Sequence, residues 1–323
     1  MESPAPAPAP LGETRRAALM RSATWASVGV ALLLVLAKAW AFRETGSVSV
    51  LSSLADSFLD ILASLLTFWA VRFSLQPPDV EHRFGHGKSE GLAALIQSLL
   101  VTGSGLYVGL EGVRHLIAPA PPEHPALGIA VIAGSTVATL ALLAWQRHVS
   151  RVTGSVAIAA DALHYRSDLA VNLAVMAAVA IAGYTGLAWL DPVVGLAVAA
   201  FVTRGAFDIG ARSLDILLDR EIPAEDRHRI RDIAVNHPKV LGFHDLRTRH
   251  GGGGYIIQFH LELDSDTTLV ETHRILDEVE EWIGAAYPGC EIIIHPDPQG
   301  FAERRDLFEE GAPVRPLAGE RAR

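Results

Sequence analysis

Apolar residues form six segments in the first part of the chain, each of roughly membrane-spanning length. We place them at about residues 19–41, 47–70, 92–110, 125–146, 155–183 and 190–213, because about 20 predominantly apolar residues cross a bilayer as a helix. Polar residues in the second segment recur at helical spacing, which favours helices over strands. The sequence therefore predicts a membrane all-α domain of six transmembrane helices.

From Asp219 onward the pattern changes to shorter elements. "PAEDRHRIRDIAV" predicts a helix that Pro223 opens, and "VETHRILDEVEEWIGAAY" predicts an amphipathic helix. "FHDLRTR" and "YIIQFHLEL" predict strands joined by a glycine turn, and "EIIIH" predicts a strand that ends before Pro296. The order αββαβ predicts a small cytoplasmic α+β domain, ferredoxin-like in outline.

Composition supports this division. The chain has 323 residues, 50% of them hydrophobic, and a net charge of -9, with the charged residues concentrated toward the C-terminus. We predict a disordered tail at 1–14, a transport domain at 15–214, a cytoplasmic domain at 215–300 and a C-terminal tail at 301–323. The single cysteine, Cys290, excludes an internal disulfide and a multi-thiolate zinc site. No nucleic-acid partner is expected.

Basic residues predict the orientation of the six segments. They gather before the first segment and in the second and fourth connections, at Arg15, Arg16, Arg21, Arg72, Arg83, Lys88, Arg147 and Arg151. The opposite connections hold Arg43 and Arg114 alone. Because basic loops stay in the cytoplasm, both termini are expected there.

Carboxylates interrupt two of the predicted spans. Asp56 and Asp60 are one helical turn apart in the second span, within a stripe of serines. In "DALHYRSDLAV" of the fifth span, Asp161, His164 and Asp168 share one helical face, and Arg166 lies roughly opposite. Each charge near the middle of a bilayer costs several kcal/mol, so a compensating function is expected.

A divalent cation would offset that cost. Asp56, Asp60, His164 and Asp168 offer three carboxylates and one imidazole, a suitable tetrahedral ligand set. The alternative is a polar helix–helix contact that holds no ion. Neighbouring carboxylates repel each other, however, and gain nothing from pairing without a cation or protons.

Several motifs together resemble one family. They are "LADSFLDILAS", "LQPPDVEHRFGHGKSE", "ADALHYRSD", "LLDR", "HDLRTR" and "IIIHPDP". On these motifs the chain, over about residues 15–300, is similar to the bacterial cation diffusion facilitators, in particular their ferrous-iron and zinc efflux branch. The resemblance implies an inner-membrane homodimer that exchanges a cytoplasmic divalent cation for protons. It assigns the transport site to Asp56, Asp60, His164 and Asp168. Asp161 would then support these ligands or lie at the mouth of the metal pathway, and Arg166 has no assigned role.

A second candidate site lies between the second and third spans. Asp79, His82 and His86 lie within "DVEHRFGHGK", and a carboxylate with two imidazoles can fold around Zn²⁺. A solvated turn is the alternative that spacing leaves open. The resemblance implies a second metal site here, and it implies that Lys88 and Asp219 make charge contacts at the dimer interface.

The soluble domain carries further histidines. Strand alternation puts Ile257 and Phe259 toward the domain's helices and His260 on the opposite face, while His295 lies in the last strand. The resemblance implies a binuclear site that bridges subunits, using His244, His260, His273, His295 and Asp297. Pro296, between the last two, offers no ligand atom for the second ion.

Three functions compete on this evidence. A divalent cation/proton antiporter accounts for both the membrane and the soluble residues. An intramembrane metalloenzyme would need a hydrolytic motif such as HExxH, which the sequence lacks, so no enzyme activity is expected. A non-transporting metal sensor would leave the membrane carboxylates without a role. The imidazole of His164 favours Zn²⁺, and the same ligands suit Fe²⁺, Cd²⁺, Co²⁺ or Mn²⁺.

Overall fold

The computed structural model describes residues 12–45, 48–117, 126–185, 190–251 and 254–300. The chain forms two compact units, which meet in sequence between Leu218 and Asp219. Most of the N-terminal tail predicted at 1–14, and the whole C-terminal tail predicted at 301–323, lie outside the described residues. The side chain of Asp56 also lies outside them, although its backbone belongs to a described helix.

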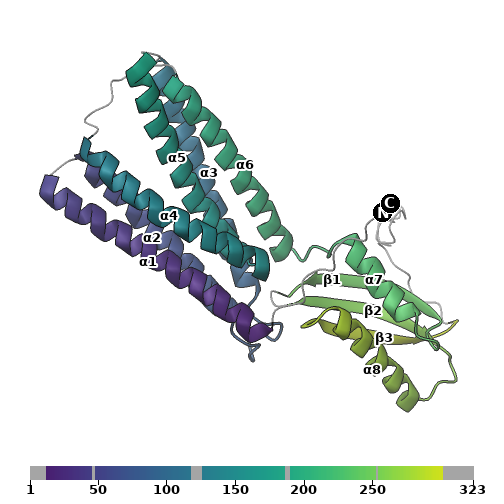
Figure 1. Cartoon of the computed structure of the whole chain (residues 1–323). Coiled ribbons are helices and arrows are strands. Elements are labelled where there is room, and N and C mark those ends of the chain that lie inside the picture. The colour runs from purple at the N-terminus through teal and green to yellow at the C-terminus, as the bar shows by residue number, and fades with distance from the viewer. Residues whose placement is uncertain (1–11, 46–47, 118–125, 186–189, 252–253, 301–323) are drawn as a thin grey trace, which may run out of the picture. The chain divides into compact units, whose positions relative to one another are not determined.

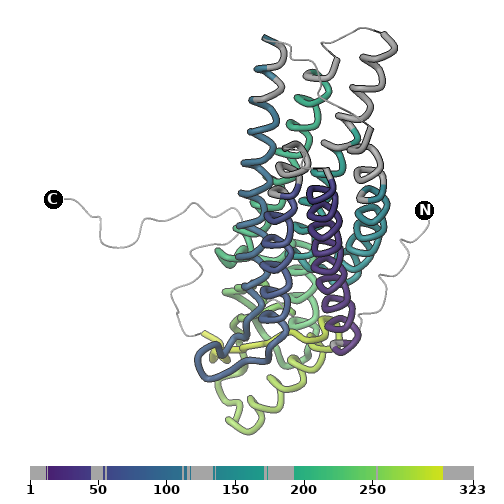
Figure 2. The backbone as a smooth tube through the Cα atoms, turned by 90° about the vertical axis from the view of Figure 1, so that its left-hand side faces the viewer, coloured from purple at the N-terminus to yellow at the C-terminus, as the bar shows by residue number. Residues whose placement is uncertain are grey.

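The first unit consists of long helices, shown in Figure 1. They are α1 (Glu13–Thr45), α2 (Val48–Ser74), α3 (Lys88–Ile117), α4 (Ala126–Thr153), α5 (Val156–Thr185) and α6 (Leu190–Leu217). Each helix covers one of the predicted apolar segments to within one residue. Figure 2 shows these helices running side by side along one common direction.

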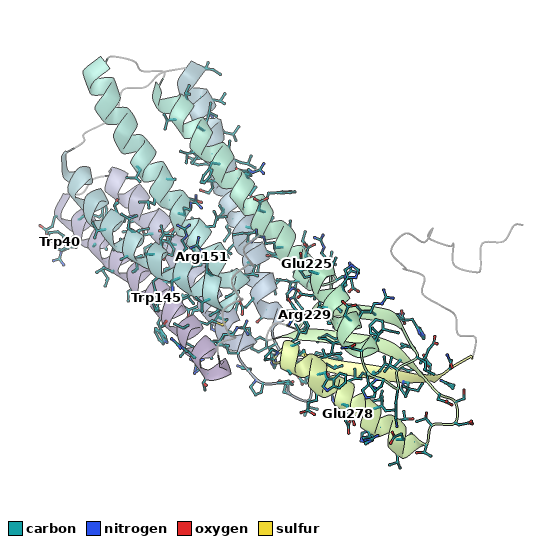
Figure 3. The ribbon with its side chains drawn as sticks, turned by 45° about the vertical axis from the view of Figure 1, so that its right-hand side comes forward. Trp40, Trp145, Arg151, Glu225, Arg229 and Glu278 are labelled. Carbon is teal, nitrogen blue, oxygen red and sulfur yellow. The ribbon has the colours of Figure 1, made fainter. Side chains whose placement is uncertain are left out.

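The outer surface of this unit is apolar. Trp40, Trp69 and Phe207 are 67%, 69% and 75% exposed. Figure 3 shows Trp40 and Trp145 on the outside of α1 and α4. A water-soluble surface does not carry this much large apolar area, so these side chains are suited to lipid. Among the described residues, four helices (α1, α2, α3 and α6) have segments long and apolar enough to cross a membrane.

The six helices separate into two groups along their length. Figure 1 shows α1, α2 and α4 close to α3, α5 and α6 at one end and diverging from them at the other. At the converging end α1, α3 and α5 begin and α2 and α4 end. The apolar core lies there, with Met20, Val71, Ala93, Val149 and Ile158 buried against one another. Among the described side chains, this core packs the two groups together at the converging end.

The second unit follows the predicted order of elements, α7 (Ala224–Val235), β1 (Gly242–His250), β2 (Tyr255–Leu263), α8 (Leu269–Ala286) and β3 (Glu291–Pro298). The sheet order is β1-β2-β3, with β1 antiparallel and β3 parallel to β2. Ile257, Phe259 and Leu261 of β2 pack in one core with Ile230 of α7 and Val279 of α8. Both helices thus cover one face of the sheet, and the predicted alternation along β2 is correct.

The end of β3 differs from the prediction. The strand does not stop before Pro296 but continues to Pro298, with Pro296 opposite Leu261. Proline has no backbone N–H to donate, and an interior strand would lose a ladder bond there. β3 is an edge strand, so its unpaired side faces no neighbour within the sheet and tolerates the two prolines.

Candidate metal centre

Three residues from two helices converge inside the first unit. The Nε2 atom of His164 on α5 lies 3.1 Å from Oδ1 of Asp60 on α2 and 3.7 Å from Oδ2 of Asp168. One ligand atom from each residue lies within 4.8 Å of the others. The two distances from His164 are shorter than two zinc bonds of about 2.0–2.2 Å placed end to end, so one divalent cation can bind the imidazole together with either carboxylate.

Asp56 precedes Asp60 by one turn of α2. Residues four apart on a helix share a face, so the backbone places Asp56 on the side of α2 that carries Asp60. Lys38 of α1 adds a positive charge beside this face, because its Nζ donates to the buried Oγ of Ser57 at 2.6 Å.

Arg166 stands apart from the cluster. Its side chain is exposed, and its guanidinium carbon lies 4.8 Å from the ring centroid of Phe201 on α6. This is a cation–π contact on the side of α5 away from His164. The contact gives Arg166 a partner that the sequence did not reveal.

The loop between α2 and α3 brings Asp79, His82 and His86 together. Oδ1 of Asp79 accepts hydrogen bonds from the backbone N–H groups of His82 at 2.6 Å and Glu81 at 2.9 Å. These bonds, the His82 bond first, lower the pKa of Asp79 below its ordinary value and keep it a carboxylate. Its Oδ2 lies 3.2 Å from Nε2 of His86.

The burial of His86 favours a metal ion at this loop. It is 5% exposed, its ring packs edge-on against Phe73 at 4.4 Å, and its Nε2 atom faces Oδ2 of Asp79 at 3.2 Å without hydrogen-bond geometry. Its Nδ1 atom has no hydrogen-bond partner among the described residues, so a bound ion would offset part of the desolvation of the ring. A Zn²⁺ ion held with Asp79 and His82 would have this effect.

The third cluster lies on the open face of the small sheet. His244, His260 and His295 are partners across the three strands. Asp297 joins them, with its carboxylate oxygens 3.3 Å, 2.8 Å and 3.2 Å from a ring nitrogen of each histidine in turn. The pairing of Pro296 with buried Leu261 places Pro296 on the helix-covered face. Pro296 therefore does not interrupt the ligand face.

His273 is not brought to this cluster within one chain. It lies on α8, 77% exposed at the side chain, with Nδ1 3.7 Å from Oδ1 of Asp277. Because α8 covers the opposite face of the sheet, the geometry of a single chain keeps His273 away from His260. Within one chain, His273 is therefore not part of the cluster formed by His244, His260, His295 and Asp297.

Asp161 is buried in a polar network. It is 0% exposed, which favours the supporting role over a place at the mouth of the metal pathway. Its Oδ2 accepts from Ser27 Oγ at 2.5 Å and from Gln146 Nε2 at 2.6 Å, and Gln97 Nε2 lies 3.4 Å from its Oδ1. The packing of α1, α3 and α4 thus encloses Asp161 in a network of polar side chains.

Two further contacts of this network, and a nearby carboxylate, were not predicted. Tyr165 is 1% exposed, and its hydroxyl lies 2.8 Å from Ser64 Oγ, which is 2.9 Å from Ser27 Oγ. At the converging end, Glu90 of α3 is also buried and accepts from Ser74 and Ser155. Isolated amides and hydroxyls in apolar helices were the available signal, but their partners come from distant segments.

Comparison with known proteins identifies the family. The cation efflux transmembrane domain family matches residues 24–218, and the cytoplasmic domain of cation efflux proteins matches residues 222–299. This chain belongs to the cation efflux family. The predicted resemblance to cation diffusion facilitators is therefore confirmed.

Curated relatives match nearly the whole chain. The cation-efflux pump FieF of Cronobacter sakazakii is 44% identical over 293 residues, which cover 91% of this chain and 96% of that protein. FieF of Shewanella oneidensis is 44% identical over 279 residues, covering 86% and 94%. FieF of Escherichia coli (strain K12 / DH10B) is 43% identical over 286 residues, covering 88% and 95%.

Proposed function

We propose that the chain exports divalent cations, with Zn²⁺ as the main substrate, in exchange for protons, and that Asp56, Asp60, His164 and Asp168 hold the cation during transport. Membership of the cation efflux family supports export of a cation by a multi-pass membrane protein. The observation that carries the proposal is the convergence of Asp60 from α2 with His164 and Asp168 from α5. An ion held between these two helices contacts both helix groups.

Zinc is preferred because one ligand is an imidazole. His164 contributes nitrogen, which suits Zn²⁺ better than an all-oxygen site does. Fe²⁺, Cd²⁺, Co²⁺ and Mn²⁺ are the competing substrates. The FieF relatives are described as cation-efflux pumps without a stated metal, so the preference rests on the donor set.

Proton exchange follows from the same donor set. A metal ligand must be deprotonated to bind, so an imidazole and carboxylates release protons as the cation enters. When the cation leaves, crowded carboxylates favour taking protons back. The cluster as a whole would then carry protons inward for each cation exported.

We propose that α4 and α5 also cross the membrane, which gives six spans with both termini in the cytoplasm. α5 supplies two ligands of the transport site, and basic residues gather at the connections assigned to the cytoplasm. The transport domain then occupies residues 15–214 and the cytoplasmic domain 215–300, flanked by tails. The αββαβ order and the one-sided helix layer support a ferredoxin-like outline for the cytoplasmic domain.

The two other clusters would hold zinc for structural or regulatory purposes. Asp79, His82 and His86 form the loop site, and His244, His260, His295 and Asp297 form the core of the cytoplasmic site. His273 lies on α8, which covers the opposite face of the sheet from the histidine cluster, so its part in a binuclear site requires a second chain. A homodimer of cytoplasmic domains supplies that chain, in keeping with the family match.

Zinc movement across a sealed bilayer tests this function against its alternatives. The purified chain is reconstituted in proteoliposomes that contain a trapped zinc-sensitive dye. Saturable, protein-dependent Zn²⁺ flux is the expected result. Zinc binding without flux would indicate a sensor, and zinc-dependent cleavage of membrane peptides without flux would indicate an intramembrane metalloenzyme.

A further inference from the structure

We propose that Asp161 positions the transport site: its carboxylate ties the two helix groups together next to His164 and thereby sets how closely His164 approaches Asp60. The inference rests on the proposed function, because it concerns the same transport site. Asp161 contributes no ligand atom to the described cluster of Asp60, His164 and Asp168. It acts on the metal through the placement of α2 and α5.

The hydrogen bonds of Asp161 cross between the helix groups. Asp161 on α5 and Gln97 on α3 belong to one group. Ser27 on α1 and Gln146 on α4 belong to the other, and both donate to Oδ2 of Asp161, at 2.5 Å and 2.6 Å. One carboxylate with no exposed surface therefore joins helices that diverge elsewhere (Figure 1).

The same network reaches α2, the other helix of the transport site. Ser27 Oγ is 2.9 Å from Ser64 Oγ, which in turn is 2.8 Å from the hydroxyl of Tyr165. Gln97 Nε2 donates to Thr67 Oγ1 at 2.5 Å and to the carbonyl oxygen of Ala63 at 3.0 Å. These α2 residues follow Asp60 within two helical turns, and Tyr165 is the neighbour of His164.

The place of the network along the helices allows it to affect the spacing of the ligands. The network lies between the apolar core at the converging end and the pair of Asp60 and His164. His164 follows Asp161 by three residues, which is about one helical turn at about 1.5 Å of rise per residue. A change in helix separation at Asp161 therefore also changes the separation of the ligands. Metal–ligand distances tolerate only about 0.2 Å of error, so such a shift changes affinity.

The network requires hydrogen-bond capacity at position 161 rather than negative charge. Oε1 of Gln146 has no hydrogen-bond partner among the described residues, while its Nε2 donates to Asp161. If the side-chain amide of Gln146 flips by about 180°, the side-chain N–H of an asparagine at position 161 can donate to Oε1 of Gln146. A leucine at position 161 leaves Ser27 and Gln146 without an acceptor, and buried polar groups without partners are costly.

The test uses Co²⁺ bound to the purified full-length chain as a spectroscopic probe. The other two clusters are first disabled together by His82→Ala, His86→Ala, His260→Ala and His295→Ala, so that Co²⁺ reports on the transport site alone. In this background Asp161→Leu, Asp161→Asn and His164→Ala are compared by size-exclusion chromatography, Co²⁺ dissociation constant and visible absorption. The absorption bands depend on coordination geometry, which a change in stability alone does not alter.

We expect Asp161→Leu to weaken Co²⁺ binding by about tenfold or more and to change the absorption bands, the size of effect seen when groups that orient metal ligands are removed. Asp161→Asn should keep the parental bands and an affinity within about threefold of the parent. Parental bands and affinity in folded Asp161→Leu would overturn the inference. Equal damage from Asp161→Asn would also overturn it, because charge rather than hydrogen bonding would then matter.

His164→Ala separates this inference from the proposed function. Loss of the parental bands in His164→Ala together with unchanged binding in Asp161→Leu would refute the role of Asp161 and leave the transport site standing. Unchanged bands in His164→Ala would refute the transport site and the inference with it. If Asp161→Leu does not fold, Ser27→Ala removes one donor at smaller cost. Ser27→Ala should weaken Co²⁺ binding several-fold, and parental binding in that variant would overturn the inference.

Discussion

The Nε2 atom of His164 lies 3.1 Å from the Oδ1 atom of Asp60, although 104 positions separate them in the chain. The two residues come from α5 and α2, which belong to different helix groups. A cation bound by both residues must therefore respond to any movement of one group against the other. This arrangement suits a site that opens to one side of a membrane at a time.

Removal of a single carboxylate from the transport site should abolish transport. Asp60→Ala and Asp168→Ala each delete one of the four proposed ligands, and four is the usual coordination number of zinc. We expect zinc flux in proteoliposomes to fall to the background of empty vesicles while size-exclusion chromatography still shows folded protein. Arg166→Gln is the matched control, because Arg166 lies over Phe201 and away from the ligands. Near-normal flux in either aspartate variant would refute the ligand assignment.

His164→Asp should change the metal preference. The substitution replaces the only nitrogen atom among the proposed ligands by oxygen, and oxygen ligands favour harder ions such as Mn²⁺. We expect the ratio of Zn²⁺ to Mn²⁺ transport to fall by about tenfold, which corresponds to about 1.4 kcal/mol of relative binding free energy. Competition between the two ions during transport measures this ratio. An unchanged ratio would mean that His164 does not bind the transported ion.

Zinc should stabilise the cytoplasmic domain through His260 and His295. A ring nitrogen of His260 lies 2.8 Å from a carboxylate oxygen of Asp297, and a ring nitrogen of His295 lies 3.2 Å from the other oxygen. A ligand that binds only the folded state adds about 2.7 kcal/mol of stability at 100 times its dissociation constant. We expect zinc to raise the melting temperature of the full-length chain relative to chelator, and to do so much less in the His260→Ala, His295→Ala variant. Equal zinc responses in the two proteins would exclude this role.

Glu271 should make the stability of the cytoplasmic domain depend on pH. Hydrogen bonds from Arg274 first, and then Lys239, lower the pKa of Glu271 from 4.5 to about 2. A lowered carboxyl pKa contributes stability that is complete above the ordinary value and is lost as pH falls toward the folded value. Glu271→Gln should therefore lower the melting temperature at pH 7, by an amount that shrinks from about pH 4.5 downward. A difference that is the same at pH 7 and pH 3 would contradict this role for the carboxylate.

Most of the fold could be predicted because local patterns determine it. The order of elements in the second unit and the inward face of β2 followed from alternation around Ile257, Phe259 and Leu261. The end of β3 did not, because whether Pro296 ends a strand depends on its place at the edge of the sheet. Sheet order is a property of the whole domain and not of the local sequence.

The candidate site shows the same division. Helical spacing placed His164 and Asp168 on one face, and the structure brings that face to Asp60. The partners of Asp161 could not be predicted, since Ser27 and Gln97 lie 134 and 64 positions away in the chain. The separation of His273 from the other histidines within one chain also depended on which face of the sheet α8 covers.

The simultaneous measurement of zinc and proton movement tests the central claim most directly. Proteoliposomes that contain the purified chain and trapped zinc and pH dyes are given a Zn²⁺ gradient, with and without an opposing pH difference. The account predicts that Zn²⁺ flux drives protons the opposite way, that an imposed pH difference changes the zinc rate, and that Asp168→Ala removes both signals. Zinc flux that is indifferent to the pH difference, with no counter-flow of protons, would contradict proton exchange, and flux that survives in Asp168→Ala would contradict the site.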